Sequence, residues 1–357
     1  MRSLLRRREA GIALALLAVI GVTTVVQPGF LLSAVGWRDL LLTPAILVVL
    51  AVGQAVVVIT RNVDLSVGSV LGLTAYLTGR LFLAAPDLPI IVVTLVAVAT
   101  GALLGLVNGS IVAFARVPAL VITLGTLYVY RGVTLTWAGS DRIDAADMPG
   151  AFLGLGTQQV LGVPVLTIVA AVVLAAVAYY LHTSRGGRQL YAIGSDPDAA
   201  ALQGLPVRRR LLGAFALGGA LAGLAGVMFA ARYGTVSSGA GTGMELQVVG
   251  AVVVGGVAIF GGSGTVVGAA LGAMLLLTIN RALPVVGIPD FWQRAVVGAL
   301  IIGAIALDRV LANRRSRRLA AARDADPPSD ADPPSGPAPQ PDADPPSGPN
   351  DRAEATT

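Results

Sequence analysis

The chain has 357 residues, of which 55% are hydrophobic and 13% charged, a composition too apolar for a water-soluble protein of this length. Its formal net charge at pH 7 is +5, carried by arginine because the sequence contains no lysine. The absence of cysteine excludes disulfides and cysteine–metal sites, and the absence of lysine excludes a nucleotide-binding P-loop, which needs that side chain.

Long stretches of the chain lack charge over about 20 residues, the length that crosses the hydrocarbon core of a bilayer. The apolar runs are continuous rather than alternating, which favours helices over a β-barrel. The fold class is therefore an all-α polytopic membrane protein. About ten transmembrane helices are predicted, at roughly Gly11–Val26, Leu40–Thr60, Val67–Ala84, Pro89–Phe114, Pro118–Trp137, Val163–Leu181, Leu211–Ala231, Leu246–Phe260, Val266–Leu283 and Phe291–Leu311.

The first span follows a basic segment, residues 1–10, that contains four arginines. No small-residue cleavage site follows the span, so it is predicted to be a retained anchor with a cytoplasmic N-terminus. Across the later spans, arginines concentrate on the same predicted side and most carboxylates on the other. Both termini are therefore expected in the cytoplasm.

The string from Asn62 to Ser69, NVDLSVGS, places an amide, a carboxylate and two hydroxyls between the second and third spans. Such groups are costly near a membrane unless they are partnered or hydrated. Two interpretations remain open. Either the string is an elbow at the cytoplasmic surface, with Asp64 or Ser66 capping the third span, or it is a break within a discontinuous helix. The elbow needs fewer assumptions.

Further polar residues occur on the fourth and fifth spans and before the eighth. Hydrogen bonding between helices is their simpler role, and lining a hydrophilic path is the functional alternative. The candidates for a translocation path are Asn62, Asp64, Ser66, Asn108, Thr123, Thr126, Tyr128 and Glu245.

A weak internal repeat supports a transporter. Asn108, Pro118 and Gly125 recur with similar spacing as Asn280, Pro289 and Gly298. In the predicted topology the two copies run in opposite directions, as inverted repeats do in transporters.

Glycines recur at intervals of four on three spans, which allows close helix packing. The cluster from Gly261 to Gly264 is interpreted as a tight interhelical turn.

The longest polar interruption, from Arg185 to Arg210, contains five arginines and is predicted to be cytoplasmic. Asp196 is suited to cap a helix, Pro197 to begin it, and Asp198 to lie at the positive end of its dipole. Gly204 and the following proline end it. A short capped helix on the cytoplasmic face is interpreted as a docking element, with an ordinary solvated loop as the alternative.

The motifs together resemble those of membrane subunits of bacterial ABC importers for monosaccharides, the ribose, xylose and galactose permease group. Branched-chain amino acid permeases are related to that group. The resemblance covers about residues 50–308. The matching motifs are VDLSVGS at 63–69, Asn108-Gly109 with Pro118, TLGT at 123–126, YAIG at 191–194, and Glu245-Leu246 leading to GGSG at 261–264. The chain departs from the pattern at Arg61-Asn62, where glycines are common, and at Ala119 and Asp196, where proline and asparagine are usual.

The resemblance implies a type II-like importer permease with inverted repeats in a bacterial inner (plasma) membrane. It also implies three protein partners: a cytoplasmic ATP-binding subunit, a second permease copy or paralogue, and an extracytoplasmic sugar-binding protein. Membrane lipid is expected as well, and nucleic acid, cofactors, metals and catalytic residues are not. The permease domain is expected over residues 11–311, with the coupling loop at 182–210. The residues implied to couple to the ATPase are Gly194, Asp196, Asp198, Ala199, Ala200 and Gly204.

The implied function is the permease of an ATP-driven importer for a pentose, hexose or deoxyhexose. A stand-alone secondary transporter or channel is the alternative, but it would need ionisable residues deep in the helices, and few are present. An intramembrane enzyme would need a nucleophile and a base, and the chain has no cysteine and one histidine, His182, at a helix end.

After the permease domain, a basic cytoplasmic segment is expected at 312–323 and a tail at 324–357. The tail repeats DADPPS and is rich in proline, glycine, serine and aspartate. It cannot bury apolar surface, so it is predicted to be disordered.

Overall fold

The computed structural model describes residues 2–115 and 117–289, together with 292, 295, 296, 298, 299, 302 and 303. All of them belong to the first of two compact units, Met1–Arg309. The basic segment at 312–323 and the tail at 324–357 lie outside the described residues. So does most of the tenth expected span, Phe291–Leu311.

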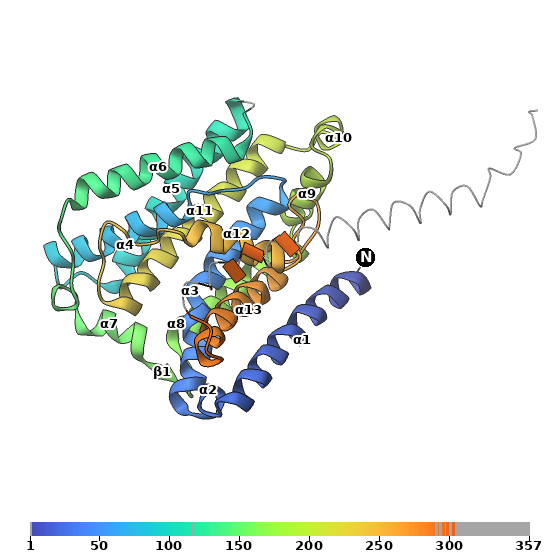
Figure 1. Ribbon diagram of the computed structural model, residues 1–357. Helices are drawn as coiled ribbons and strands as arrows, with labels where there is room; N and C mark the ends of the chain where they lie inside the picture. Colours follow the sequence, from blue (N-terminus) through green and yellow to red (C-terminus); the bar gives the residue numbers. More distant parts are fainter. Residues whose placement is uncertain are drawn as a thin grey trace, which may run out of the picture. The chain divides into compact units, whose positions relative to one another are not determined.

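The described chain is predominantly helical, with one short hairpin (Figure 1). Its elements are, in chain order, α1 (Arg2–Val26), α2 (Gly29–Leu32), α3 (Ala34–Ile59), α4 (Val67–Ala84), α5 (Ile90–Ala115), α6 (Ala119–Ala138), the 3-10 helix η1 (Ala145–Asp147), α7 (Gly150–Thr157), β1 (Gln159–Val160), β2 (Val163–Pro164), α8 (Val165–Thr183), α9 (Arg185–Ser195), α10 (Pro197–Leu202), α11 (Val207–Tyr233), α12 (Met244–Val254) and α13 (Val266–Val285).

Eight of the described helices are long and apolar enough to cross a membrane, namely α1, α3, α4, α5, α6, α8, α11 and α13. They confirm the polytopic helical fold. The eighth expected span, Leu246–Phe260, was predicted too long, because α12 ends at Val254 rather than near Phe260. The chain turns there at Gly255 and Gly256, and left-handed glycines follow at 261, 262 and 264. The tight turn predicted at this cluster is confirmed.

Proline and glycine set many of the helix boundaries. Proline fixes its own φ and lacks an N–H that the first helical turn would leave unpaired, so it suits a helix start. Gly139 and Gly234 follow α6 and α11 with φ of +55° and +63°, a region that side chains with a Cβ rarely adopt. The prolines that immediately precede described helices are Pro28, Pro89, Pro118, Pro149, Pro164 and Pro206, before α2, α5, α6, α7, α8 and α11.

The α11 helix is central, and its main neighbours are α5, α4 and α3. It lies antiparallel to α5 in a glycine seam made by Gly101 and Gly105 of α5 with Gly219 and Gly223 of α11. A Cβ built on Gly101 would lie 2.9 Å from Gly223 Cα, and one on Gly219 would lie 2.9 Å from Gly105 Cα. The packing role predicted for these glycines is confirmed.

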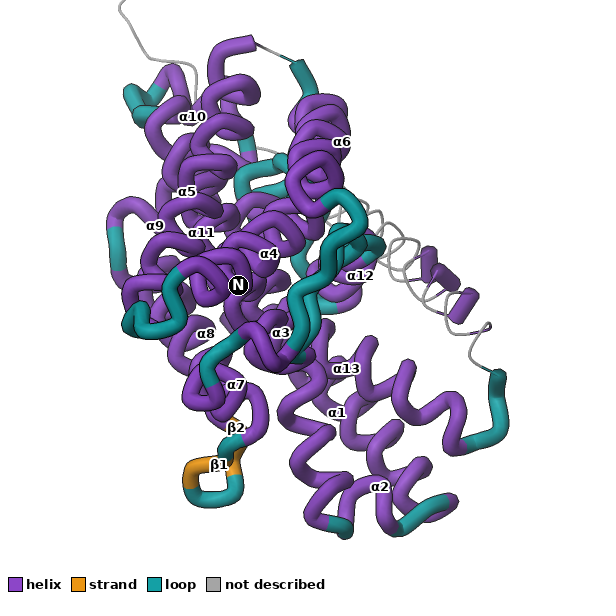
Figure 2. Tube along the Cα trace, turned by 90° about the vertical axis from the view of Figure 1, so that its left-hand side faces the viewer, coloured by secondary structure: helices purple, strands orange, loops and turns teal. Residues whose placement is uncertain are grey.

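The helix of the predicted docking element, α10, and the β1–β2 hairpin lie at opposite ends of the long helices. Both views place α10 at one end and the β1–β2 hairpin, with α2, at the other (Figures 1 and 2). The hairpin pairs Val160 with Val163 in antiparallel register, and α1 packs along α13. The capped helix and the hairpin are therefore separated by the length of the long helices.

We expect Gly219→Ala to lower the free energy of unfolding by about 1–3 kcal/mol, because the added methyl forces α5 and α11 apart. Gly132 in α6 is the matched control, since a Cβ there meets nothing within 4 Å. Gly132→Ala should be neutral or stabilise by up to about 1 kcal/mol. Thermal unfolding of the full chain in detergent compares the two. Equal melting temperatures would contradict the seam.

Candidate functional site

The connection between α3 and α4 carries two polar side chains that are buried inside the protein. Asp64 and Ser66 have exposed fractions of 1% and 0%. The Asp64 Oδ1 atom accepts hydrogen bonds from the Ser66 backbone N–H at 2.8 Å and from the Ser66 hydroxyl at 2.7 Å. Neither side chain accepts a bond from the first turn of α4, although Ser66 is the N-cap. The cap predicted for Asp64 or Ser66 is therefore wrong, and both side chains are buried between the two helices. The choice between an elbow at the cytoplasmic surface and a break within a discontinuous helix stays a prediction.

Residues of α3, α5 and α6 supply hydrogen-bond partners for the polar groups of this connection. Asn108 Nδ2 donates to Ser66 Oγ at 2.8 Å, and the Thr123 hydroxyl donates to the Val63 carbonyl oxygen at 3.0 Å. The Tyr130 hydroxyl lies 3.0 Å from Asn108 Oδ1. In the orientation that satisfies both its groups, the Gln54 side-chain amide bonds the Asp64 backbone carbonyl and N–H at 3.1 Å each. We call this set the buried polar cluster: Gln54, Asp64, Ser66, Asn108, Thr123 and Tyr130.

Four of the eight residues proposed for a translocation path thus belong to the buried polar cluster. They form hydrogen bonds with one another or with the backbone, which is the simpler of the two roles considered for them. They do not line the cavity between α3, α11, α12 and α13 that is described below. Thr126 bonds the Thr123 carbonyl of its own helix, and Asn62 bonds Thr60. Tyr128 is 70% exposed, and Glu245 accepts from Gly243 N–H at the start of α12. Their place on a path stays a prediction.

The docking element has the local structure that its residues predict. Asp196 ends α9 and caps α10, and its Oδ1 accepts from the N–H groups of Asp198 and Ala199 at 3.1 Å and 3.0 Å. Pro197 occupies the first position of α10, and Gly204 follows the helix with φ of +73°. The capped helix is confirmed.

The exposure of α10 changes which of its residues can meet a partner. Ala200 is only 5% exposed, so it packs α10 onto the rest of the protein, and its role in coupling to the ATPase stays a prediction. Leu202 is 90% exposed, and Asp198, Ala199 and Ala201 are also exposed. These four side chains form the free face of α10.

Three segments meet where α9 packs against the rest of the protein: Gly194 of α9, residues 59–61 at the end of α3, and the turn at 261–262. We call this meeting point the junction. Gly262 N–H donates to the Ile59 carbonyl at 2.9 Å, and a Cβ on Gly194 would lie 2.7 Å from Gly262 N. Gly194 is therefore buried and serves packing. Arg61 has φ of +68°, a conformation that favours glycine, which explains why glycine is common at this place in the group that the chain resembles.

A tyrosine ties α9 to the same turn. The Tyr191 hydroxyl donates to the Gly264 carbonyl oxygen at 3.0 Å. Burial, and secondarily the charge of Glu9, raises the pKa of Tyr191 to about 12. The hydroxyl therefore keeps its proton, and its hydrogen bond, at physiological pH.

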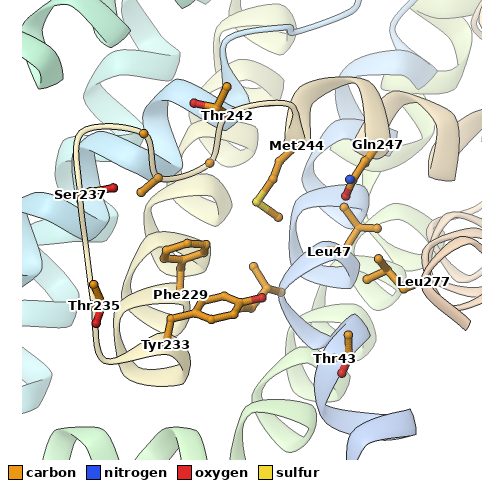
Figure 3. Close-up of a pocket in the computed structure, with 14 residues that line it drawn as sticks. Thr43, Leu47, Phe229, Tyr233, Thr235, Ser237, Thr242, Met244, Gln247 and Leu277 are labelled. Atoms are coloured by element: carbon orange, nitrogen blue, oxygen red, sulfur yellow. The ribbon is translucent and has the colours of Figure 1, made fainter. Parts of the chain in front are cut away.

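A cavity of about 460 Å³ lies between α3, α11, α12 and α13 and the loop before α12. The Phe229 and Tyr233 rings pack together with centroids 4.5 Å apart and line it (Figure 3). The polar side chains that line it are Thr43, Thr235, Ser237, Thr242 and Gln247, and no charged side chain of the described residues is among the lining. We call it the neutral cavity. Sequence reasoning missed all of these residues.

Arg131 of α6 fixes one wall of the neutral cavity. Its Nη1 donates to the carbonyl oxygens of Ala240 at 2.6 Å and Ser238 at 3.3 Å, in the loop between α11 and α12. Within the described residues, no three histidine, aspartate or glutamate side chains gather as a metal site would require. The cavity therefore offers neutral hydrogen-bonding groups and aromatic faces.

Comparisons with known proteins give one family and several close relatives. The family model described as "Branched-chain amino acid transport system / permease component" matches residues 38–305. The autoinducer 2 import system permease protein LsrC of Enterobacter sp. (strain 638) is 37% identical over 308 residues, covering 86% of this chain and 88% of that protein. The protein of the same name from Escherichia coli O9:H4 (strain HS) is 36% identical over 328 residues, covering 90% and 94%. No solved structure gives a significant match.

We expect Asp64→Ala to lower the free energy of unfolding by about 2–4 kcal/mol, because it leaves the Ser66 N–H and hydroxyl buried without an acceptor. Asp64→Asn keeps an oxygen acceptor at that place and should cost about 1 kcal/mol or less. Asp141→Ala removes an exposed carboxylate and is the control. Thermal unfolding in detergent distinguishes them. A melting temperature for Asp64→Ala equal to that of Asp141→Ala would show that the bonds carry no weight.

Proposed function

The chain belongs to the family of permease components of branched-chain amino acid transport systems, and on this premise we propose that it carries a sugar-like solute. It is a multi-pass membrane protein and a permease subunit of an ABC importer. Such a subunit is not itself an enzyme, because ATP hydrolysis belongs to a partner. The solute, its path and the contacts with partners are what we propose.

The neutral cavity is the observation that carries the choice of solute. Sugars present hydroxyl groups and apolar ring faces, and a site for them needs neutral donors and acceptors beside aromatic surfaces. The stacked Phe229 and Tyr233, with Gln247 and the nearby hydroxyls, have this character. A free branched-chain amino acid carries two charges that no side chain lining the cavity would match.

The relatives narrow the set of solutes to test. The two relatives described above are named as permeases of an autoinducer 2 import system. We propose autoinducer 2 as one candidate, beside pentoses, hexoses and deoxyhexoses. An extracytoplasmic binding protein would deliver the solute at the end of the permease that carries the hairpin.

The free face of α10 is our proposed contact with the ATP-binding subunit. The arginines around α9 and α10 favour the cytoplasm for this end. The exposed Leu202 supplies an apolar anchor of the kind that central interface residues provide. The junction holds α9 against the end of α3 and the turn at 261–262. A movement of α9 and α10 would therefore shift the backbone of the connection that carries the buried polar cluster.

A second permease subunit, identical or paralogous, is proposed to complete the importer. We also propose an extracytoplasmic binding protein and membrane lipid as partners, as the resemblance implies. No part of this assembly is needed to explain the fold of the single chain.

We expect Leu202→Asp to weaken association with the ATP-binding subunit about tenfold or more. The leucine is exposed in the single chain, and the proposed interface would bury it. Leu161 is 100% exposed at the hairpin tip, and Leu161→Asp is the matched control at the opposite end. Co-purification of a tagged chain with the ATPase, followed by uptake, measures both. If Leu202→Asp retains the ATPase as well as Leu161→Asp does, α10 is not the dock.

We expect Gln247→Leu to lower uptake of the correct solute by roughly fivefold, because it removes one hydrogen bond worth on the order of 1 kcal/mol. Uptake of labelled autoinducer 2, pentoses, hexoses and deoxyhexoses by cells with the whole importer identifies the solute. Tyr179→Phe, on an exposed face of α8, is the control. Uptake by Gln247→Leu equal to that by Tyr179→Phe for every solute tested would show that the neutral cavity is not part of the transport path.

A further inference from the structure

A separate cavity of about 390 Å³ lies between α3, α8, α9 and α11, and the proposed transport path does not use it. This volume falls in the range of roughly 300–1,000 Å³ that small-molecule sites occupy. Its lining changes along α11, from Arg209 and Arg210 at the start of the helix to Leu217 two turns later. We call it the lateral cavity.

The polar end of the lateral cavity consists of cations and a hydroxyl. Arg209 is exposed and Arg210 is half-buried. Arg210 Nε donates to Gln189 Oε1 of α9 at 2.6 Å, which orients the guanidinium and leaves its other N–H groups available. Neither arginine forms an ion pair with a carboxylate of the described chain.

Gly186 brings the hydroxyl and the cation together. A Cβ at this position would lie 2.7 Å from the Tyr180 hydroxyl oxygen and 2.8 Å from Arg210 Nη1. Both groups therefore converge over Gly186, where any larger residue would displace them. The cavity has hydrogen-bond donors at this end that suit an anionic oxygen ligand.

The rest of the lateral cavity is apolar. Val56, Val177, Leu190 and Leu217 line it, and Gly213 has open space where its Cβ would be. The positive-inside rule places the arginine-rich end at the cytoplasmic face. The inner leaflet carries anionic lipids, and basic pockets between transmembrane helices on that side bind their headgroups.

We propose that the lateral cavity binds an anionic phospholipid of the inner leaflet. The phosphate lies between Arg209, Arg210 and the Tyr180 hydroxyl, and the start of an acyl chain lies along Val177 and Leu217. A free phosphate would match the arginines but leave the apolar lining unused. Because Arg210 also bonds Gln189, the bound lipid holds α9 against α11, next to the docking helix.

The first test is lipid retention by the full chain in detergent, measured by native mass spectrometry after mixing with equal amounts of phosphatidylglycerol and phosphatidylcholine. The unchanged chain should retain phosphatidylglycerol preferentially. The double variant Arg209→Gln/Arg210→Gln should bind it about tenfold or more weakly, as expected for two basic residues facing an anionic lipid. Arg185→Gln/Arg188→Gln makes the same charge change on exposed residues outside the cavity and should stay within about twofold.

A second variant tests the apolar part with both arginines in place. Gly213→Leu fills open space without a clash at its Cβ, so the chain should fold, and its melting temperature checks this. It should weaken retention of phosphatidylglycerol. Equal retention by the double-arginine variant and its control would overturn the proposal. Binding of inorganic phosphate that is unchanged in Gly213→Leu would also overturn it, because the cavity would then bind a free anion. Loss of self-association in Gly213→Leu, with no change in lipid retention, would overturn it too, because the cavity would then contact a second copy of the chain.

Discussion

The structure depends on one constraint: backbone groups removed from water in a membrane protein must find partners inside the protein. Helices meet this demand by themselves, but the connection between α3 and α4 does not. There the Gln54 amide bonds the backbone of Asp64, and Thr123 bonds the carbonyl of Val63. Because these partners come from α3 and α6, the connection also fixes how those helices pack against α4.

The same connection brings the docking end and the interior close together. Ile59, the last residue of α3, accepts from Gly262 N–H, and Gly194 packs against both. A few residues further along the chain, Asp64 joins the buried polar cluster. Backbone contacts have little freedom to adjust, since interiors are close-packed. The packing contacts therefore run without a gap from α9 to the connection that carries the buried polar cluster.

Local chemistry was predictable from the sequence, and the arrangement of helix faces was not. The start of α10 follows from Asp196 and Pro197 alone, because a cap and a fixed φ act within one turn. Hydropathy found the long spans but overextended α12, where glycines end the helix inside an apolar run. Tyr130 was passed over for Tyr128, although Tyr130 lies seven residues from Thr123 and so shares its face. The neutral cavity joins four helices and a loop, and no local pattern records that meeting.

The glycine seam also divides the chain by how readily it accepts a substitution. At Gly101, Gly105, Gly219 and Gly223, every replacement adds a Cβ where atoms of the facing helix already lie. At Gly125 and Gly132 of α6 the same change meets open space. Sterics therefore restrict α5 and α11 to glycine at these four places, while α6 has room for a larger side chain at Gly125 and Gly132. The close approach of α5 and α11 is thus the part of the fold least able to absorb a substitution.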